Sequence, residues 1–343
     1  MPNNRIFYAC QAVAIAQTGH NSGDNFRIMH GVQSVGINTN FTLEQAFELG
    51  QVDLYANEEE IAEVEVTIEK LIDGYPLLYL QAVGNIGKTN VVAASNSRSD
   101  VYLALYEDNV ADISGETPGS VVVCSGMYVS SVSYNYPVDG FATESLTLVG
   151  NDKFWNSQVP AVVSNAITRY IADSTEDDSF NGNDAGPSGL VRRARVNIPA
   201  CVIPPEVCTQ RHQGPTVVGG QTIANSGIQS ISISADFGRE NQLELGRFGP
   251  YNRFATFPFE ITTEFQVSAT SGDLVSVSGF GNNLRDRTIV IRDLAGTVIN
   301  LGNKNKLSSI AQSGGDTGGG NMTITYSYST FNTFTVDGGG TYY

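Results

Sequence analysis

Residues 31–50, GVQSVGINTNFTLEQAFELG, decide the fold, because residues 227–246, GIQSISISADFGRENQLELG, repeat them. At this spacing of 196 residues, nine positions of the first stretch are identical in the second. They are Gly31, Gln33, Ser34, Ile37, Phe41, Glu44, Glu48, Leu49 and Gly50. The spacing is far longer than the roughly 20–50 residues of a solenoid repeat. We interpret it as a duplicated domain.

Glycine begins and ends both stretches. We expect the two copies to share the structural positions Gly31, Gln33 and Gly50 in the first and Gly227, Gln229 and Gly246 in the second. Glycine adopts a positive φ without steric cost. The sequence therefore predicts Gly50 and Gly246 at equivalent turns or bulges that leave the first hairpin of each copy.

The agreement continues beyond these stretches. After a one-residue slip, residues 64–69 (VEVTIE) match 259–264 (FEITTE), and further on 132–136 (VSYNY) match 324–328 (ITYSY). Side chains of a strand alternate between its two faces. One face of the first strand is therefore apolar, whereas the other carries Glu63, Glu65 and Glu69, and we match Glu65 and Glu69 to Glu260 and Glu264.

The chain divides into an N-terminal arm (1–30), a first domain (31–156), a linker with the arm of the second copy (157–226) and a second domain (227–343). Within the first domain we expect strands over 31–41, 101–106 and 143–149, a pair of strands within 50–72 and two strands within 120–136. We also expect a short helix over 76–83, where Pro precedes a run of Leu and Ala. The fold class is mainly β, with two tandem sandwich or barrel domains, each flanked by a short helix.

Composition agrees with a β-rich class: of 343 residues, 16% are charged and 36 are Gly. The net charge of −16 argues against a surface that grips nucleic acid, which needs clustered Lys and Arg. No apolar run is long enough to cross a membrane, and the N-terminus lacks the context of a signal-peptide cleavage site. We expect a soluble chain made in a cytoplasm, with no membrane partner.

The sequence offers no catalytic constellation. The histidines are His20, His30 and His212, and no zinc-protease, hydrolase or phosphate-loop motif accompanies them. Asp139 and Glu144 are better explained as turn or sheet-surface residues than as a catalytic pair. We predict a protein that is not an enzyme and has no cofactor or metal. The sequence contains four cysteines, Cys10, Cys124, Cys201 and Cys208. We expect them to be buried and free, and the alternative is a Cys10–Cys201 cross-link.

Several stretches resemble the tail tube (major tail) proteins of tailed bacteriophages. Residues 31–50, 64–70 and 73–76 are similar to the opening of these proteins, and residues 125–134, 137–140 and 143–150 to their later strands. Residues 246–259 resemble the second half of the larger members. The resemblance covers most of the chain outside residues 157–190.

The resemblance implies a virion protein of the tail, assembled in the host cytoplasm. Single-domain relatives form rings of six that stack into a tube, which holds the tape measure protein and conducts double-stranded DNA. Two tube domains per chain would then give a ring of three chains with pseudo-sixfold symmetry. The partners implied are further copies of the chain, tail terminator and baseplate or tip proteins, and a sheath in contractile tails.

Two questions stay open at the level of sequence. A secreted or surface β-sandwich protein that binds a glycan or a host receptor would have a similar composition. The acidic set Glu63, Glu65, Glu69, Glu260 and Glu264 must face water, which in a tube is either the lumen or the exterior. A negative lumen would repel phosphates and let DNA slide, and we expect at least part of this set to line it.

Overall fold

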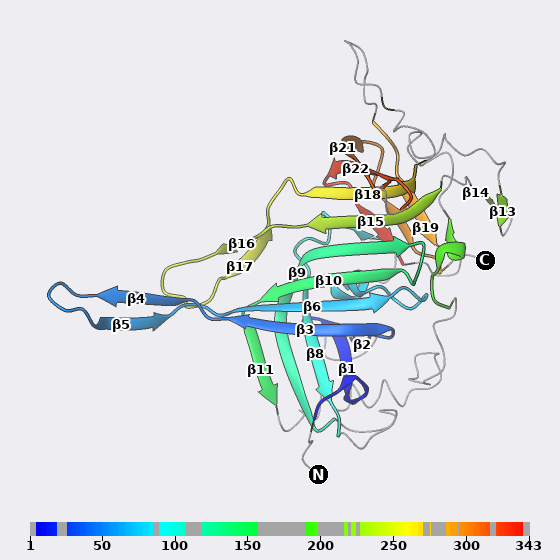
Figure 1. The fold of residues 1–343 in the computed structure, drawn as a ribbon. Helices are drawn as coiled ribbons and strands as arrows, with labels where there is room; N and C mark the ends of the chain where they lie inside the picture. Colours follow the sequence, from blue (N-terminus) through cyan, green and yellow to red (C-terminus); the bar gives the residue numbers. More distant parts are fainter. Residues whose placement is uncertain are drawn as a thin grey trace.

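The computed structural model is mainly β, as the sequence predicts, and is arranged around one large sheet (Figure 1). The structure describes residues 5–18, 26–84, 89–107, 118–156, 189–197, 216–218, 221–223, 227–269, 275, 286–293, 295–315 and 320–338. Its α-helix, α1 (Leu78–Ala82), lies within the predicted range 76–83. The counterpart of α1 expected in the second copy falls outside the described residues, as do Cys201, Cys208, His20 and His212.

Eight antiparallel strands lie side by side and span both halves of the chain, with the first four from residues 31–156 and the last four from residues 227–343. Their order across the sheet is β3 (Val32–Asn40), β6 (Glu63–Leu71), β10 (Thr143–Gly150), β9 (Ser120–Pro137), β15 (Ile228–Asp236), β18 (Glu260–Ser268), β22 (Thr323–Phe331) and β21 (Lys306–Ser313). We call this the eight-strand sheet. The two halves join where β9 pairs with β15, with Tyr134 opposite Ile233.

The prediction of two strands within 120–136 is wrong, because β9 is one strand. Gly126 has a φ of 64° and forms a bulge instead of a turn. The Asp100 carboxylate holds this bulge by accepting hydrogen bonds from the Gly126 N–H at 2.8 Å and the Ser125 hydroxyl at 3.0 Å. The first half of β9 pairs with β8 (Arg98–Leu105) and β11 (Asp152–Asn156), and its second half belongs to the eight-strand sheet.

Residues of the proposed N-terminal arm extend this side of the sheet. Strand β1 (Gln11–Gln17) pairs with β8 along its length, and β2 (Phe26–Ile28) pairs with β1. The centre of β1 is buried, with Ile15 fully inaccessible. These residues are therefore part of the core.

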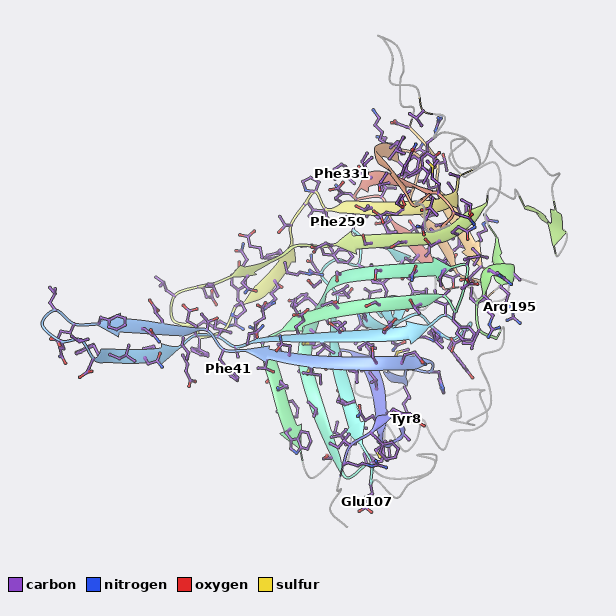
Figure 2. All side chains as sticks on the ribbon, viewed as in Figure 1. Tyr8, Phe41, Glu107, Arg195, Phe259 and Phe331 are labelled. Atoms are coloured by element: carbon purple, nitrogen blue, oxygen red, sulfur yellow. The ribbon has the colours of Figure 1, made fainter. Side chains whose placement is uncertain are left out.

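Two hairpins leave the sheet on the same side and protrude from the body (Figures 1 and 2). One consists of β4 (Leu43–Phe47) and β5 (Leu54–Glu59), and the other of β16 (Arg239–Gln242) and β17 (Asn252–Ala255). Gly50 and Gly246 lie in their connecting turns with φ of 97° and 86°. Both turns expose apolar side chains, since Leu49 and Leu245 lie entirely in solvent.

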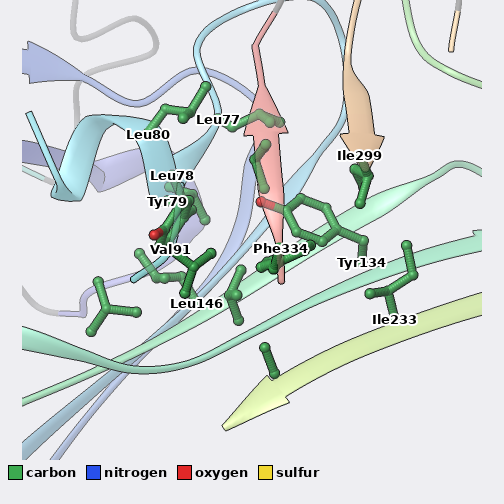
Figure 3. Close-up of a cluster of buried hydrophobic side chains, with 14 of the residues drawn as sticks. Leu77, Leu78, Tyr79, Leu80, Val91, Tyr134, Leu146, Ile233, Ile299 and Phe334 are labelled. Carbon is green, nitrogen blue, oxygen red and sulfur yellow. The ribbon is translucent and has the colours of Figure 1, made fainter. Parts of the chain in front are cut away.

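A second sheet packs behind the first and also joins the two halves. Its order is β12 (Val196–Asn197), β19 (Val290–Asp293), β20 (Val298–Asn300), β23 (Thr335–Asp337) and β7 (Thr89–Asn90). A separate hairpin consists of β13 (Thr216–Val218) and β14 (Gln221–Ile223). Between the sheets, side chains of both halves form one core, in which the Tyr134 and Phe334 rings lie 6.3 Å apart (Figure 3).

A buried carboxyl connects the two sheets at Asp293. It accepts hydrogen bonds from the Thr297 N–H at 2.9 Å and from the Tyr136 hydroxyl at 3.4 Å. Burial raises the pKa of Asp293 to about 6, against the lowering effect of the Thr297 hydrogen bond. The folded chain therefore holds this proton at a pH where the unfolded chain has released it.

We expect Asp293 to make folding stability fall as pH rises from about 4 to about 6. In this window the folded state binds more protons, so ionisation favours unfolding, by about 3 kcal/mol for a rise of this size. Asp293→Asn should remove this component. Urea unfolding at low protein concentration and several pH values measures the free energy of unfolding of the wild type and of Asp293→Asn. The difference between the two proteins should change between pH 4 and pH 6, and a constant difference would contradict the prediction.

Candidate assembly surface

The eight-strand sheet has one buried face and one polar face, because its strands alternate in register. On the buried face, Val66, Leu148 and Ile233 are almost inaccessible to solvent. The polar face is built mainly from Ser, Thr and Asn. Its ionisable side chains are Glu63, Glu65, Glu69, Asp236, Glu260, Glu264 and Lys306.

The five predicted acidic residues therefore share one face of the sheet. Glu65 lies opposite Asn38, and Glu69 opposite Ser34. Glu264 accepts a hydrogen bond from the Ser327 hydroxyl at 3.3 Å. Carboxylates whose neighbours are small hydroxyl or amide side chains leave this face negative along its length.

Glu63 differs from the other four because a cation neutralises it. Its carboxylate lies 3.1 Å from the Arg253 guanidinium, whose side chain is 3% exposed. Arg253 also donates to the Asn151 side-chain oxygen at 3.2 Å. Arg253 belongs to β17, so this ion pair ties the second hairpin to the end of β6. The acidic character of the face depends on the remaining residues.

The register of the strand pairs shows which residues of the first half correspond to which residues of the second half, and it differs from our match of the acidic residues. Glu65 lies opposite Asn38, and Thr262 lies opposite Ser234, the residue 196 positions after Asn38. Thr262 is thus the counterpart of Glu65, and our matching of Glu65 with Glu260 is wrong by two residues. The same correction applies to Glu69 and Glu264. A shift of two residues keeps a side chain on the same face, so the common face remains.

The matching of residues 132–136 with 324–328 is also wrong. The first segment lies in β9, whereas the second lies in β22. Strand β22 pairs with β18 as β10 pairs with β6, so β22 corresponds to β10, and β21 corresponds to β9. The two segments resemble each other because each places two tyrosines in the core from alternate positions of a strand, Tyr134 and Tyr136 in β9 and Tyr326 and Tyr328 in β22.

The two halves nevertheless share irregular features at the spacing of 196 residues. The register slips after Val32 in β3 and after Ile228 in β15. Gly31 and Gly227 have φ of 74° and 73°. The side-chain amide of Gln33 donates to the Gly31 carbonyl at 3.3 Å, and that of Gln229 to the Gly227 carbonyl at 3.1 Å. A shared bulge with a shared glutamine contact supports the proposed duplication.

A second pair of bulges fixes the correspondence of β9 with β21. Opposite β10, the register of β9 skips Ser130, and opposite β22 that of β21 skips Ser308. On one side of each bulge, Val129 of β9 lies opposite Leu148, and Leu307 of β21 lies opposite Tyr328. Ser130 and Ser308 are therefore equivalent, 178 residues apart, which sequence matching did not reveal.

Within the described part of the chain, both edges of the eight-strand sheet are open. Among the strands that the structure describes, β3 pairs only with β6, and β21 only with β22. An open edge presents unpaired N–H and C=O groups and pairs readily with another strand. Because every pair in the run is antiparallel, β3 and β21 run in opposite directions. The β21 edge of one molecule therefore suits the β3 edge of another.

Glu144 and Asp139 do not form a carboxylate pair. Glu144 is fully buried and accepts hydrogen bonds from the Leu78 and Tyr79 N–H groups at the start of α1 and from the Tyr134 hydroxyl. Burial raises its pKa against these hydrogen bonds. Asp139 is exposed, 3.7 Å from Arg193. Glu144 thus positions a helix, which corrects our placement of it on the sheet surface or in a turn.

Other features of the described residues fit no chemical site. No group of three or more His, Cys, Asp or Glu side chains within them is arranged to hold a metal ion. Cys10 and Cys124 are buried and free, and burial raises the pKa of Cys124 to about 11. The helices of the described chain are all too short or too polar to span a membrane.

Comparison with known proteins gives weak structural similarities. No family model matches the sequence, and no curated protein matches it. A chain in the 6-fold symmetrised cryo-EM structure of the anti-feeding prophage baseplate is 13% identical, with a TM-score of 0.34, and the match covers 45% of this chain and 97% of that one. Hcp1 from Flavobacterium johnsoniae is 10% identical, with a TM-score of 0.23 and coverage of 42% and 99%. Both TM-scores are too low to establish a shared fold.

Proposed function

We propose that this chain is a structural subunit of a phage-type tail tube, in which three chains close a ring and rings stack around a channel for double-stranded DNA. The observation that carries the proposal is the eight-strand sheet, which combines two similar halves and ends in two open, oppositely directed edges. Joining such edges in a circle leaves no edge exposed. The resemblance of the sequence to tail tube proteins supports the same arrangement.

The polar face supports a channel in the interior of the ring. Barrels of about 16 to 18 strands already leave an aqueous interior, and three copies of the eight-strand sheet exceed that size. The buried face already has its core, so the polar face is the one left to contact water in the lumen. Glu65, Glu69, Glu260 and Glu264 would then repel the phosphates of passing DNA.

The protruding hairpins suit contacts between stacked rings. They leave the body in the direction of the sheet strands (Figure 1). Their exposed side chains include Phe47, Leu49 and Leu245. Exposed apolar groups gathered on such projections mark interaction sites. The tape measure protein, a terminator and baseplate or tip proteins are the further partners of this proposal, which assigns the chain no catalytic role.

Solution mass and negative-stain imaging of the purified full chain test the proposal. We expect particles of three chains at low concentration, and open-ended tubes as the concentration rises. A secreted or surface β-sandwich binding protein would give neither species. A chain that stays monomeric at all concentrations, without rings or tubes, would rule out the tube function.

A further inference from the structure

The chain contains an internal example of the junction that a ring needs between chains. Strand β9 ends the first half of the eight-strand sheet and β15 begins the second half, and they pair directly. Strand β21 ends the second half as β9 ends the first, and β3 begins the first half as β15 begins the second. If three chains form a ring, the contact of β21 with β3 of the next chain repeats a contact already present within each chain.

The equivalent bulges at Ser130 and Ser308 predict which residues of β21 and β3 lie opposite each other. Within the chain, Ser133 lies opposite Ser234. Ser133 is three residues after the bulged Ser130, which makes Ala311 its counterpart in β21. Ser234 corresponds to Asn38 at the spacing of 196 residues. The internal junction therefore predicts that Ala311 of one chain lies opposite Asn38 of the next.

Phe41 supports this register through its contrast with Phe237, the identical residue 196 positions later. Phe237 follows β15 and is 1% exposed, whereas Phe41 follows β3 and is 66% exposed. Figure 2 shows the position of Phe41 where β3 leaves the body. The Phe237 ring is stacked on that of Tyr79, with centroids 6.4 Å apart. Its centroid is also 5.1 Å from that of Phe259 in its own half. Tyr79 belongs to the other half of the chain, so Phe237 is buried between residues of both halves at the internal junction. Phe41 has no preceding half within its own chain.

The backbone at Phe237 adds a second contact of the same kind. Its N–H donates to the Ser130 carbonyl at 2.9 Å, at the bulge of β9. The counterparts are the Phe41 N–H and the Ser308 carbonyl, and both lie at open edges. The β3 segment contains no charged residue and no proline, which are the usual protections of an exposed edge strand.

We propose that β3 pairs with β21 of a second copy of this chain in the register of the internal junction, with Asn38 opposite Ala311, Asn40 opposite Ser309 and Phe41 covered by the second copy. The proposal rests on the ring function proposed above and adds its residue-level geometry. It also explains why an identical phenylalanine is buried in one half of the chain and exposed in the other.

Disulfide cross-linking tests the register. The hydrogen bond of the Phe237 N–H to Ser130 makes residues 237 and 130 a hydrogen-bonded pair, so the pair 234 and 133, three positions away, is not hydrogen-bonded. The equivalent Cα atoms of residues 38 and 311 would lie about 4.5 Å apart, close enough for a disulfide. Residue 309 would lie about 8 Å from residue 38, beyond disulfide reach.

We expect the full chain with Asn38→Cys and Ala311→Cys to form covalent oligomers of up to three chains under mild oxidation, at least tenfold faster than the matched chain with Asn38→Cys and Ser309→Cys. All three positions are exposed in the single chain, so the variants should fold. The wild-type chain and each single variant show the background from native cysteines. Phe41→Ala should slow the linkage of the first pair, whereas Tyr8→Ala, which removes an aromatic ring that is 88% exposed ahead of β1 and outside both edge strands, should not.

The outcomes separate the register from the ring. If rings are seen by imaging but the second cysteine pair links as fast as the first, the register is wrong and the ring function stands. An unchanged rate in Phe41→Ala would overturn the assignment of Phe41 to the interface. If the wild-type chain forms no ring, both the register and the proposed function fail.

Discussion

Replacing Thr39 by proline is expected to prevent ring assembly while leaving the chain folded. Residues 235 and 132 form a hydrogen-bonded pair in the internal junction, two positions from the pair of Phe237 and Ser130. Thr39 is the counterpart of Ala235, so its N–H points away from β6 to the open edge. Proline removes this donor and places its ring where the next strand would bind. The carbonyl of the next strand then loses its hydrogen bond, at a cost of about 1–3 kcal/mol. This amounts to roughly a tenfold to hundredfold weaker association at each junction.

Thr39→Ala is the matched control. The Thr39 hydroxyl accepts a hydrogen bond from Lys153, and both substitutions remove it, but alanine keeps the backbone N–H. We expect Thr39→Ala to form rings and Thr39→Pro to remain a monomer with the same far-UV circular dichroism spectrum. Sedimentation velocity measures the difference. Rings of normal abundance in the folded proline variant would show that β3 is not an assembly edge.

Reversing the charge of the polar face is expected to make assembled tubes retain double-stranded DNA. Lys at positions 65, 69, 260 and 264 replaces four carboxylates per chain with four cations on the proposed lumen wall. Cations that contact phosphates release counterions, so retention should fall steeply with salt, by about a thousandfold or more between 50 and 200 mM. Wild-type tubes should retain no DNA under the same conditions. Co-sedimentation of labelled DNA with tubes, over a series of salt concentrations, measures this.

Two further observations decide how this result is interpreted. Substitution of the same four residues by Gln removes the negative charges without adding cations, and these tubes should retain as little DNA as the wild type. The Lys variant should keep its fold, because these side chains lie on the solvent side of the sheet. Lys-variant tubes that retain no DNA at low salt would place the polar face outside the channel.

The sequence predicted those features that depend on local alternation. The period of two in residues 63–69 placed Glu65 and Glu69 on one face and Val66 on the other, as the structure shows. The helix of residues 78–82 followed from a local pattern of Pro, Leu and Ala. Such predictions hold because backbone geometry fixes the direction of each side chain within a few residues.

The sequence did not predict how distant strands combine. The pairing of β9 with β15 depends on contacts between segments about one hundred residues apart, for which the local pattern carries no signal. The register of Glu65 and Thr262 was misjudged by two residues, because either alignment leaves the acidic residues on one face. Burial of Glu144 was missed because its partners, the N–H groups of Leu78 and Tyr79, lie far away in the sequence.

The two hairpins are similar in path but differ in composition. Leu43 of the first hairpin is half-exposed, whereas its counterpart Arg239 donates to the Val129 carbonyl at 2.7 Å and lies over the Tyr128 ring. A ring of three such chains would display the two kinds of projection in alternation. Two rings stacked after a rotation of one third of a turn would meet with identical contacts, but after one sixth of a turn each projection would meet the other kind. Fusing two similar halves would thus distinguish a rotation of one sixth of a turn between neighbouring rings from one of a third of a turn. In a ring of six identical subunits, these two rotations give the same contacts.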